Sequence, residues 1–260
     1  METKFIPYEA ANSCPGSRIG VIAPHPDDEV FGPGGSLAIW SQNVISVAVV
    51  SDGMGWGQQE NLEQIRQEES KAACRVLSLP EPEFWRHPDG HLLERQDALR
   101  SQIQQWIEQH QLDCVFIPSI WEMHRDHRAC AEAGLLAALN AKCLESVWQY
   151  EIGRPLERVN RLVDISEVFE QKQTAMRCYP SQFEMQNYFE QITALNIYRT
   201  YTLAKSCKAA EGFYALNVEH VAEFLRLHQP QRLTQQLFAT EPRPQTLLQT
   251  LKQWLCPAKT

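Results

Sequence analysis

The sequence predicts an α/β protein with a mainly parallel sheet, helices on both faces of that sheet and a helical C-terminal tail. Three short apolar runs, each ended by polar residues or glycine, are typical of buried strands: "RIGVIA" (18–23), "VISVAVVSDG" (44–53) and "DCVFIPS" (113–119). Two helix-like segments separate the second run from the third. Continuous apolar strands that alternate with long helices indicate a parallel sheet buried on both faces.

The helices are expected from the spacing of apolar residues and from their stop signals. The stretch 32–42 reads as the first helix, because its glycines let the helix start lie close to the sheet. Apolar residues at helical spacing predict helices over 60–79, which stops at Pro80, and over 93–111. The other expected elements are a helix at 128–142, strands at 146–152 and 161–166, a helix at 167–179, and helical segments from about 217 that are broken by Pro230, Pro242 and Pro244.

The whole chain, 1–260, is expected to be a single domain with a core at about 18–216 and the helical tail at about 217–260, since no repeat or linker interrupts it. Hydrophobic residues make up 43% and charged residues 22%, as in a well-packed globular protein. The net charge of −8 argues against nucleic acid as a partner, because binding to phosphate backbones requires clustered Lys and Arg.

The sequence also predicts a cytoplasmic protein without a membrane span. No run approaches the ~18 consecutive apolar residues that a spanning helix needs, and the N-terminus has no apolar segment preceded by basic residues. The 8 cysteines are scattered and none forms a C-x-x-C pair, so we expect reduced, mostly buried thiols.

Three polar clusters follow the three predicted strands. "PHPDDE" (24–29) follows the first strand directly, "SDG" (51–53) ends the second, and "HRDHR" (124–128) begins five residues after the third. In open parallel sheets, ligands bind beyond the carboxyl ends of the strands. The clusters are therefore expected to meet at one edge of the sheet.

Two histidines and one carboxylate are a sufficient set of protein ligands for a catalytic zinc ion that keeps one position for water. His25 and Asp28 are three residues apart across a turn and could both face one ion, with His127 or His124 as the third ligand. Asp27 would point away from the ion but remain near its water, where a general base belongs.

Each cluster also has a plainer interpretation. "HPDDE" could be a solvated turn with a helix-capping aspartate, and "HRDH" could be an exposed helix start with Asp126 as its N-terminal charge. Two such clusters at equivalent strand ends are harder to explain in this way, because His and carboxylates gathered in a cleft usually mark metal binding or catalysis.

Two other function classes remain as alternatives. A His-x-Asp pair with a distant His is also the ligand pattern of non-haem iron oxygenases, although their ligands lie on the strands of a jelly roll. A sugar-binding protein without catalysis is a further possibility. It is disfavoured because none of the candidate residues is missing, namely His25, Asp27, Asp28, His124, Asp126 and His127.

The series "PHPDDE", a Gly-rich helix start, "SDG", "R-x-x-E" (66–69) and "HRDH" resembles the PIG-L/LmbE-like family of zinc-dependent N-acetylglucosaminyl deacetylases. Later segments at 172–182 and 210–216 are similar as well, so the resemblance covers roughly residues 18–216. It implies a Rossmann-like fold, with zinc held by His25, Asp28 and His127 and with Asp27 as the general base.

The resemblance further implies that His124 stabilises the oxyanion or protonates the leaving amine, and that Asp126 orients His124. It implies that Arg66 and Asp89 contact the sugar. Arg125 departs from the pattern, because the family usually has proline at that position.

The implied activity is metal-dependent hydrolysis of an N-acetyl or other N-acyl group on an N-acetylglucosamine-type sugar or glycoconjugate. The implied cofactor is Zn²⁺, with another divalent ion such as Fe²⁺ able to occupy the same site. Among Trp56, Trp85 and Trp121, the last is the best candidate to stack on a sugar face. Glu29 is expected to be a structural acceptor at the start of the first helix.

Overall fold

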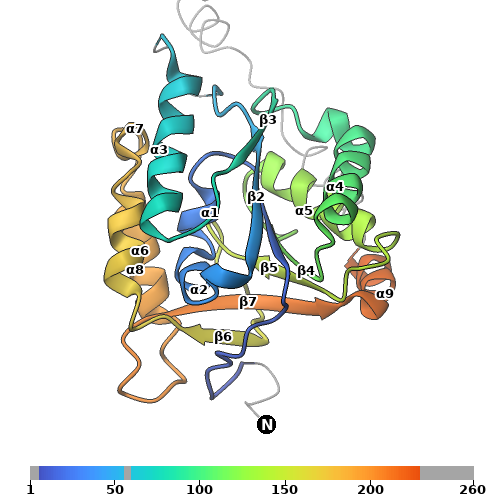
Figure 1. Ribbon diagram of the computed structural model, residues 1–260. Coiled ribbons are helices and arrows are strands. Elements are labelled where there is room, and N and C mark those ends of the chain that lie inside the picture. Colours follow the sequence, from blue (N-terminus) through green and yellow to red (C-terminus); the bar gives the residue numbers. More distant parts are fainter. Residues whose placement is uncertain (1–5, 56–59, 229–260) are drawn as a thin grey trace, which may run out of the picture.

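A computed structural model describes residues 6–55 and 60–228, which form a seven-stranded sheet between two layers of helices (Figure 1). The order of the strands across the sheet is β3-β2-β1-β4-β5-β7-β6. The strands are β1 (Ile19–Ala23), β2 (Val44–Ser51), β3 (Glu83–His87), β4 (Cys114–Pro118), β5 (Ser146–Tyr150), β6 (Arg161–Asp164) and β7 (Ala210–Asn217).

The first five strands are parallel, and β7 lies antiparallel between β5 and β6. In the central register, Val21 of β1 pairs with Val47 of β2 and with Phe116 of β4. The order 3-2-1-4-5 of the parallel part is that of a doubly wound Rossmann-like sheet, which confirms the predicted fold class. In such a sheet, the connections diverge between β1 and β4, and a crevice opens at the carboxyl ends of these two strands.

Helices cover both faces of the sheet. One face is packed by α1, α2, α3, α6 and α8, and the other by α4, α5 and α9 (Figure 1). Each layer buries its own apolar cluster against the sheet. The helices are α1 (Asp28–Phe31), α2 (Gly34–Ile39), α3 (Leu62–Val76), α4 (Gln96–His110), α5 (Arg125–Ala138), α6 (Phe169–Met176), α7 (Pro180–Phe183), α8 (Tyr188–Tyr198) and α9 (Val218–His228).

Two helix starts differ from the sequence prediction. The helix expected at 32–42 is present as the shorter α2, and a separate short helix, α1, precedes that range; α1 ends at Phe31, and Pro33, which has no amide hydrogen, lies between the two helices. Helix α5 begins at Arg125 rather than at 128, because His124 caps it. Both shifts place motif residues inside helices: Asp28 opens α1, and His127 lies in the first turn of α5.

Five elements were not predicted from the sequence, namely α1, β3, α7, α8 and β7. Strand β3 is a short edge strand with mostly half-exposed residues, so it lacks an apolar run. Strand β7 and helix α8 lie in segments without clear periodicity. In α8, apolar and aromatic residues lie on both sides of the helix: Ile192 is buried, whereas Tyr198 is exposed.

Of the helical tail predicted at about 217–260, residues 218–228 form α9, and residues 229–260 lie outside the described part of the chain. Over residues 6–55 and 60–228, no helix is both long enough and apolar enough to cross a bilayer. The seven cysteines within these ranges are free thiols, and four of them are buried.

Candidate active site

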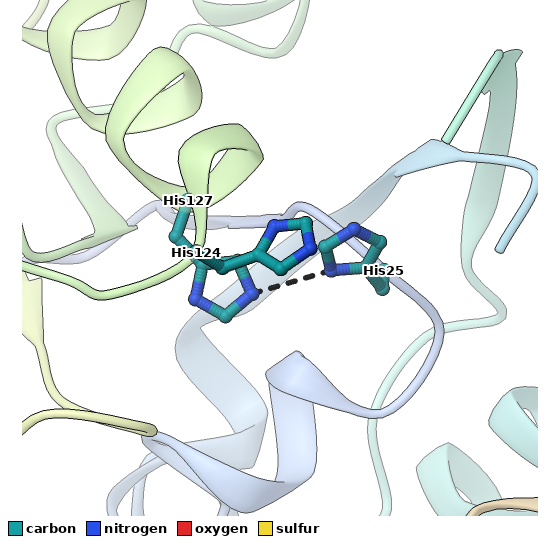
Figure 2. A group of neighbouring side chains, drawn as sticks. All are labelled: His25, His124 and His127. Atoms are coloured by element: carbon teal, nitrogen blue, oxygen red, sulfur yellow. Dashed lines mark hydrogen bonds between the residues drawn. The ribbon is translucent and has the colours of Figure 1, made fainter. Parts of the chain in front are cut away.

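The polar clusters meet at the carboxyl ends of β1 and β4, where the sheet topology predicts a crevice. His25 follows β1, Asp28 is the first residue of α1, and His124 and His127 begin α5 after β4. Figure 2 shows the three imidazole rings gathered together, with His25 hydrogen-bonded to His127. Ligand nitrogens of the three rings all lie within 4.8 Å of one another.

The predicted ligands His25, Asp28 and His127 form a tight triangle. Nδ1 of His25 lies 3.2 Å from Oδ2 of Asp28 and 3.2 Å from Nε2 of His127, and the last two atoms are 3.1 Å apart. Ligand atoms that bind one tetrahedral ion at 2.0–2.1 Å are separated by roughly 3.3 Å. The three atoms are therefore spaced as ligands of one metal ion, and all three residues are buried.

Acidic side chains lie next to both imidazoles of the predicted ligands, on the side away from the triangle. Nε2 of His25 is 3.1 Å from Oδ1 of Asp89 and 3.7 Å from Oδ2 of Asp126. On the other side, Nδ1 of His127 has no hydrogen bond among the described residues, and its nearest ionic partner is Oε2 of Glu122 at 3.7 Å. Carboxylates behind ligand histidines fix the tautomer and the ring orientation.

Glu122 was missed by sequence reasoning. Its carboxylate also accepts the backbone N–H groups of Ile152 and Gly153, so it is held in place next to His127. A carboxylate two residues before His124, in the same loop after a buried strand, was the available signal.

His25, Asp89 and Asp126 are also close enough together to hold an ion. Their carboxylates, however, already accept backbone N–H groups, with Gly55 donating to Asp89 and Gly90 and Leu92 to Asp126. We therefore assign to these two aspartates the task of holding His25. Asp89 thus contacts His25. It also lines the cavity, and the resemblance to the family implies that it contacts the sugar there.

Asp27 has a strained backbone, with φ at 138°. A non-glycine residue rarely adopts such a conformation, and the cost is about 1–3 kcal/mol. Several contacts hold it: its carbonyl accepts the N–H groups of Val30 and Phe31, and its own N–H donates to Glu29. Glu29 is thus the structural acceptor that the sequence predicted.

The Asp27 carboxylate is buried and accepts a hydrogen bond from Nη2 of Arg66 at 3.0 Å. Arg66 also donates to the carbonyls of Gly53 and Pro26, so most of its guanidinium is occupied by the protein. Burial raises the pKa of Asp27 to about 8, although the charge of Arg66 opposes the rise. A carboxyl group in such surroundings takes up a proton readily.

His124 faces the same cavity from the start of α5. Its Nδ1 accepts the backbone N–H of Asp126 at 3.2 Å, so the ring hydrogen of the neutral form is on Nε2. Burial, followed by the neighbouring His25 and His127, lowers the pKa of His124 to about 4. Asp126, which is expected to orient His124, contacts its ring through the backbone amide, whereas the Asp126 carboxylate lies near His25.

A buried ion pair holds the chain just after the segment that carries His25 and Asp28. Nζ of Lys172, on α6, donates to Oε1 of Glu211 at 2.6 Å and to the carbonyls of Phe31 and Gly32. Glu211 in turn accepts the N–H groups of Gly35 and Ser36 at the start of α2. Both charged side chains are at most 2% exposed. The pair therefore ties α1 and α2 to α6, which carries Lys172, and to β7, which carries Glu211.

A cavity of about 630 Å³ lies over these groups and is lined on one side by His25, Asp27, Asp28, Arg66, Asp89, Glu122, His124 and His127. Trp121 does not line it, contrary to the prediction, because its ring packs against Tyr214 and Phe224. Trp85 packs against Trp106, and Trp56 lies outside the described residues. Arg125, at the position of the usual proline, forms an ion pair with Glu94.

Comparisons with known proteins give a consistent result. The family model PIG-L, described as GlcNAc-PI de-N-acetylase, matches residues 20–138. A diacetylchitobiose deacetylase from Thermococcus kodakarensis is 30% identical over 192 residues, which are 64% of this chain and 70% of that protein. A probable N-acetyl-alpha-D-glucosaminyl L-malate deacetylase 2 from Bacillus cereus is 26% identical over 187 residues, 63% of this chain and 83% of that protein.

Among solved structures, the N,N'-diacetylchitobiose deacetylase from Pyrococcus horikoshii superimposes with a TM-score of 0.68. The match covers 79% of this chain and 86% of that one, at 21% sequence identity. At this identity the similarity supports the fold.

Proposed function

Because the chain belongs to the PIG-L family of de-N-acetylases, we propose that it hydrolyses the N-acetyl group of an N-acetylglucosamine-type sugar or glycoconjugate with the help of a divalent metal ion. The observation that carries the proposal is the triangle of His25, Asp28 and His127 in the same cavity wall as Asp27 and His124. The products are acetate and a free amino sugar.

His25, Asp28 and His127 would hold the metal. Zinc fits the mixed nitrogen and oxygen donors, and Fe²⁺ can use the same set. When bound, such an ion would lower the pKa of its bound water to about 7 and polarise a carbonyl oxygen. Asp89 and Glu122 would keep the two imidazoles in the orientation that the ion needs.

Asp27 acts as the general base in this proposal. It takes a proton from the attacking water, because its buried carboxylate lines the cavity beside the ligands without being one of the three atoms of the triangle. Arg66 and the strained backbone hold the carboxylate in place. The protonated Asp27 can then return the proton to the nitrogen of the leaving amine.

His124 stabilises the negative charge on the former carbonyl oxygen. Since its Nδ1 is an acceptor for the Asp126 amide, Nε2–H is the group that it offers to the cavity as a donor. A neutral imidazole fixed as a donor is an effective oxyanion group, because no reorganisation is needed during the reaction. The geometry thus favours oxyanion stabilisation over the alternative role of amine protonation.

The doubly wound sheet argues against an iron oxygenase, because the ligands of those enzymes lie on the strands of a jelly roll. A non-catalytic sugar-binding protein would have no use for a buried, strained Asp27 next to a metal-ligand triangle, because such strain persists chiefly where function requires it.

The test is amine release from N-acetylglucosamine, its disaccharide and N-acetylated glycoconjugates by purified, metal-loaded protein. A chelator should abolish turnover, and added Zn²⁺ or Fe²⁺ should restore it. Undiminished turnover by protein shown to be metal-free by elemental analysis would overturn the metal-dependent reaction.

A further inference from the structure

A second part of the cavity lining, which we call the outer wall, comes from elements later in the chain than the candidate metal ligands. It is built by the segment after β5 and by α7 and α8, with the apolar side chains of Ile152, Ile192 and Leu195 and the ring of Tyr188. Three uncharged amides also line this part of the cavity, those of Gln182, Gln186 and Gln191. A cavity of about 630 Å³ is in the range that encloses a drug-sized ligand, so there is room for a group attached to the reacting sugar.

The charges around the cavity are almost all negative. Asp27, Asp28, Asp89 and Glu122 line it, and Arg66 is the one Lys or Arg among its described lining residues. Arg66 is already paired with Asp27 and with two carbonyls. An anionic group on the substrate that lies away from the metal would therefore meet carboxylates, and the described lining residues offer it no unpaired Lys or Arg.

The arginines close to the outer wall are also occupied. Arg199, at the end of α8, is 5% exposed and binds both carboxylate oxygens of Glu151. Arg154, between two lining residues, donates to the carbonyl of Trp121. Neither side chain lines the cavity.

We infer that the group attached to the reacting N-acetylglucosamine unit is uncharged, such as a second neutral sugar or an apolar aglycone, and that phosphate- or carboxylate-bearing conjugates are poor substrates. This inference rests on the proposed deacetylation and deepens it. The apolar face of a sugar ring fits Ile152, Ile192 and Leu195, while its hydroxyl groups can bond to the glutamine amides. Selectivity against anions comes from the missing counter-charge.

The first experiment compares three substrates: N-acetylglucosamine, the neutral disaccharide N,N'-diacetylchitobiose, and the anionic N-acetylglucosamine 1-phosphate. We expect kcat/KM to be at least about tenfold higher for the disaccharide than for the monosaccharide, and lower for the phosphate than for either. A phosphate conjugate that is turned over as well as the disaccharide would overturn the inference.

A charge-introducing variant tests the wall directly. Gln191→Arg places a guanidinium in the wall, away from the reacting groups, and should raise kcat/KM for the phosphate by about tenfold. The matched control is Ile197→Arg, which adds the same charge to the same helix at a half-exposed position outside the cavity lining. An equal gain in both variants, or no gain in Gln191→Arg, would contradict the assigned wall.

Affinity measurements can distinguish a failure of this inference from a failure of the proposed reaction. Calorimetry with the same three compounds on Asp27→Asn, in which turnover should be nearly lost, measures their affinities alone. If wild-type protein deacetylates none of them, the proposed function fails for this class of compound, but tighter binding of the disaccharide than of the phosphate still supports the uncharged site. No binding of the disaccharide, or tighter binding of the phosphate, overturns it.

Discussion

Replacing each of the adjacent aspartates by asparagine should produce two different defects. Oδ2 of Asp28 lies 3.2 Å from Nδ1 of His25 and 3.1 Å from Nε2 of His127, so Asp28→Asn replaces the one anionic ligand by a neutral amide. Loss of a residue that only supports a ligand already costs 10–100-fold in metal affinity, and loss of the ligand itself should cost at least about that much. Excess metal should rescue part of the activity.

Asp27→Asn should keep the metal and lose turnover. The substitution leaves the triangle intact and removes the proton acceptor, and general-base catalysis contributes about 10²–10⁴-fold. Asparagine tolerates positive φ better than most residues, so the strained backbone is not an obstacle. Arg66 loses one partner but still donates to Gly53 and Pro26, so the destabilisation should stay below the roughly 3–5 kcal/mol of a fully broken buried pair.

The assay measures metal content by elemental analysis, amine release at saturating zinc and thermal melting for both variants. Asp113→Asn is the matched control, since its carboxylate accepts the N–H groups of Ser17 and Arg18 at the amino ends of β1 and β4, on the other side of the sheet from the site. It should retain metal and turnover. Metal loss in Asp27→Asn together with metal retention in Asp28→Asn would mean that Asp27 is the ligand and Asp28 the base. Full activity in both would refute the catalytic interpretation of the motif.

Three further predictions concern groups around this pair. His124→Ala should lower kcat by roughly 10²–10³-fold with metal content near that of wild type, while His127→Ala should deplete the metal; the reverse pattern would exchange their roles. Glu122→Gln should weaken metal binding by about 10–100-fold in a competition titration with a chelator, and an unchanged affinity would show that Glu122 does not support His127. Lys172→Met should destabilise the fold by about 3–5 kcal/mol, because Glu211 remains buried without its cation, whereas Lys71→Met at a solvated pair should change the melting temperature far less; equal shifts would contradict this account.

Sequence reasoning reached the fold class and the motifs because both depend on local patterns. The apolar runs of β1, β2 and β4 are continuous, and polar residues after them must lie at one edge of a parallel sheet. Strand β3 could not be predicted in the same way, because its residues are half-exposed and only pairing with β2 makes them a strand.

The contacts of individual site residues depend on tertiary packing and were harder to predict. Nothing in the spacing of "HRDH" says that the Asp126 amide, and not its carboxylate, contacts His124, or that this carboxylate turns toward His25. Trp121 follows the general tendency of aromatic residues to pack in the core, which a position near a motif does not change.

The chemistry and the substrate preference belong to different parts of the chain. The proposed ligands, base and oxyanion donor all lie between His25 and His127, inside the segment 20–138 that the family model matches. The outer wall of the cavity lies between Ile152 and Leu195, outside that segment. The buried Lys172–Glu211 pair joins the two parts, because Lys172 binds the carbonyls of Phe31 and Gly32 and Glu211 accepts N–H groups at the start of α2. Arg199 at the end of α8 binds Glu151 just after β5, a contact within the second part. Since the proposed reacting groups and the outer wall come from different parts of the chain, we expect that substitutions in the wall can change which sugar conjugate fits while the reacting groups keep their positions.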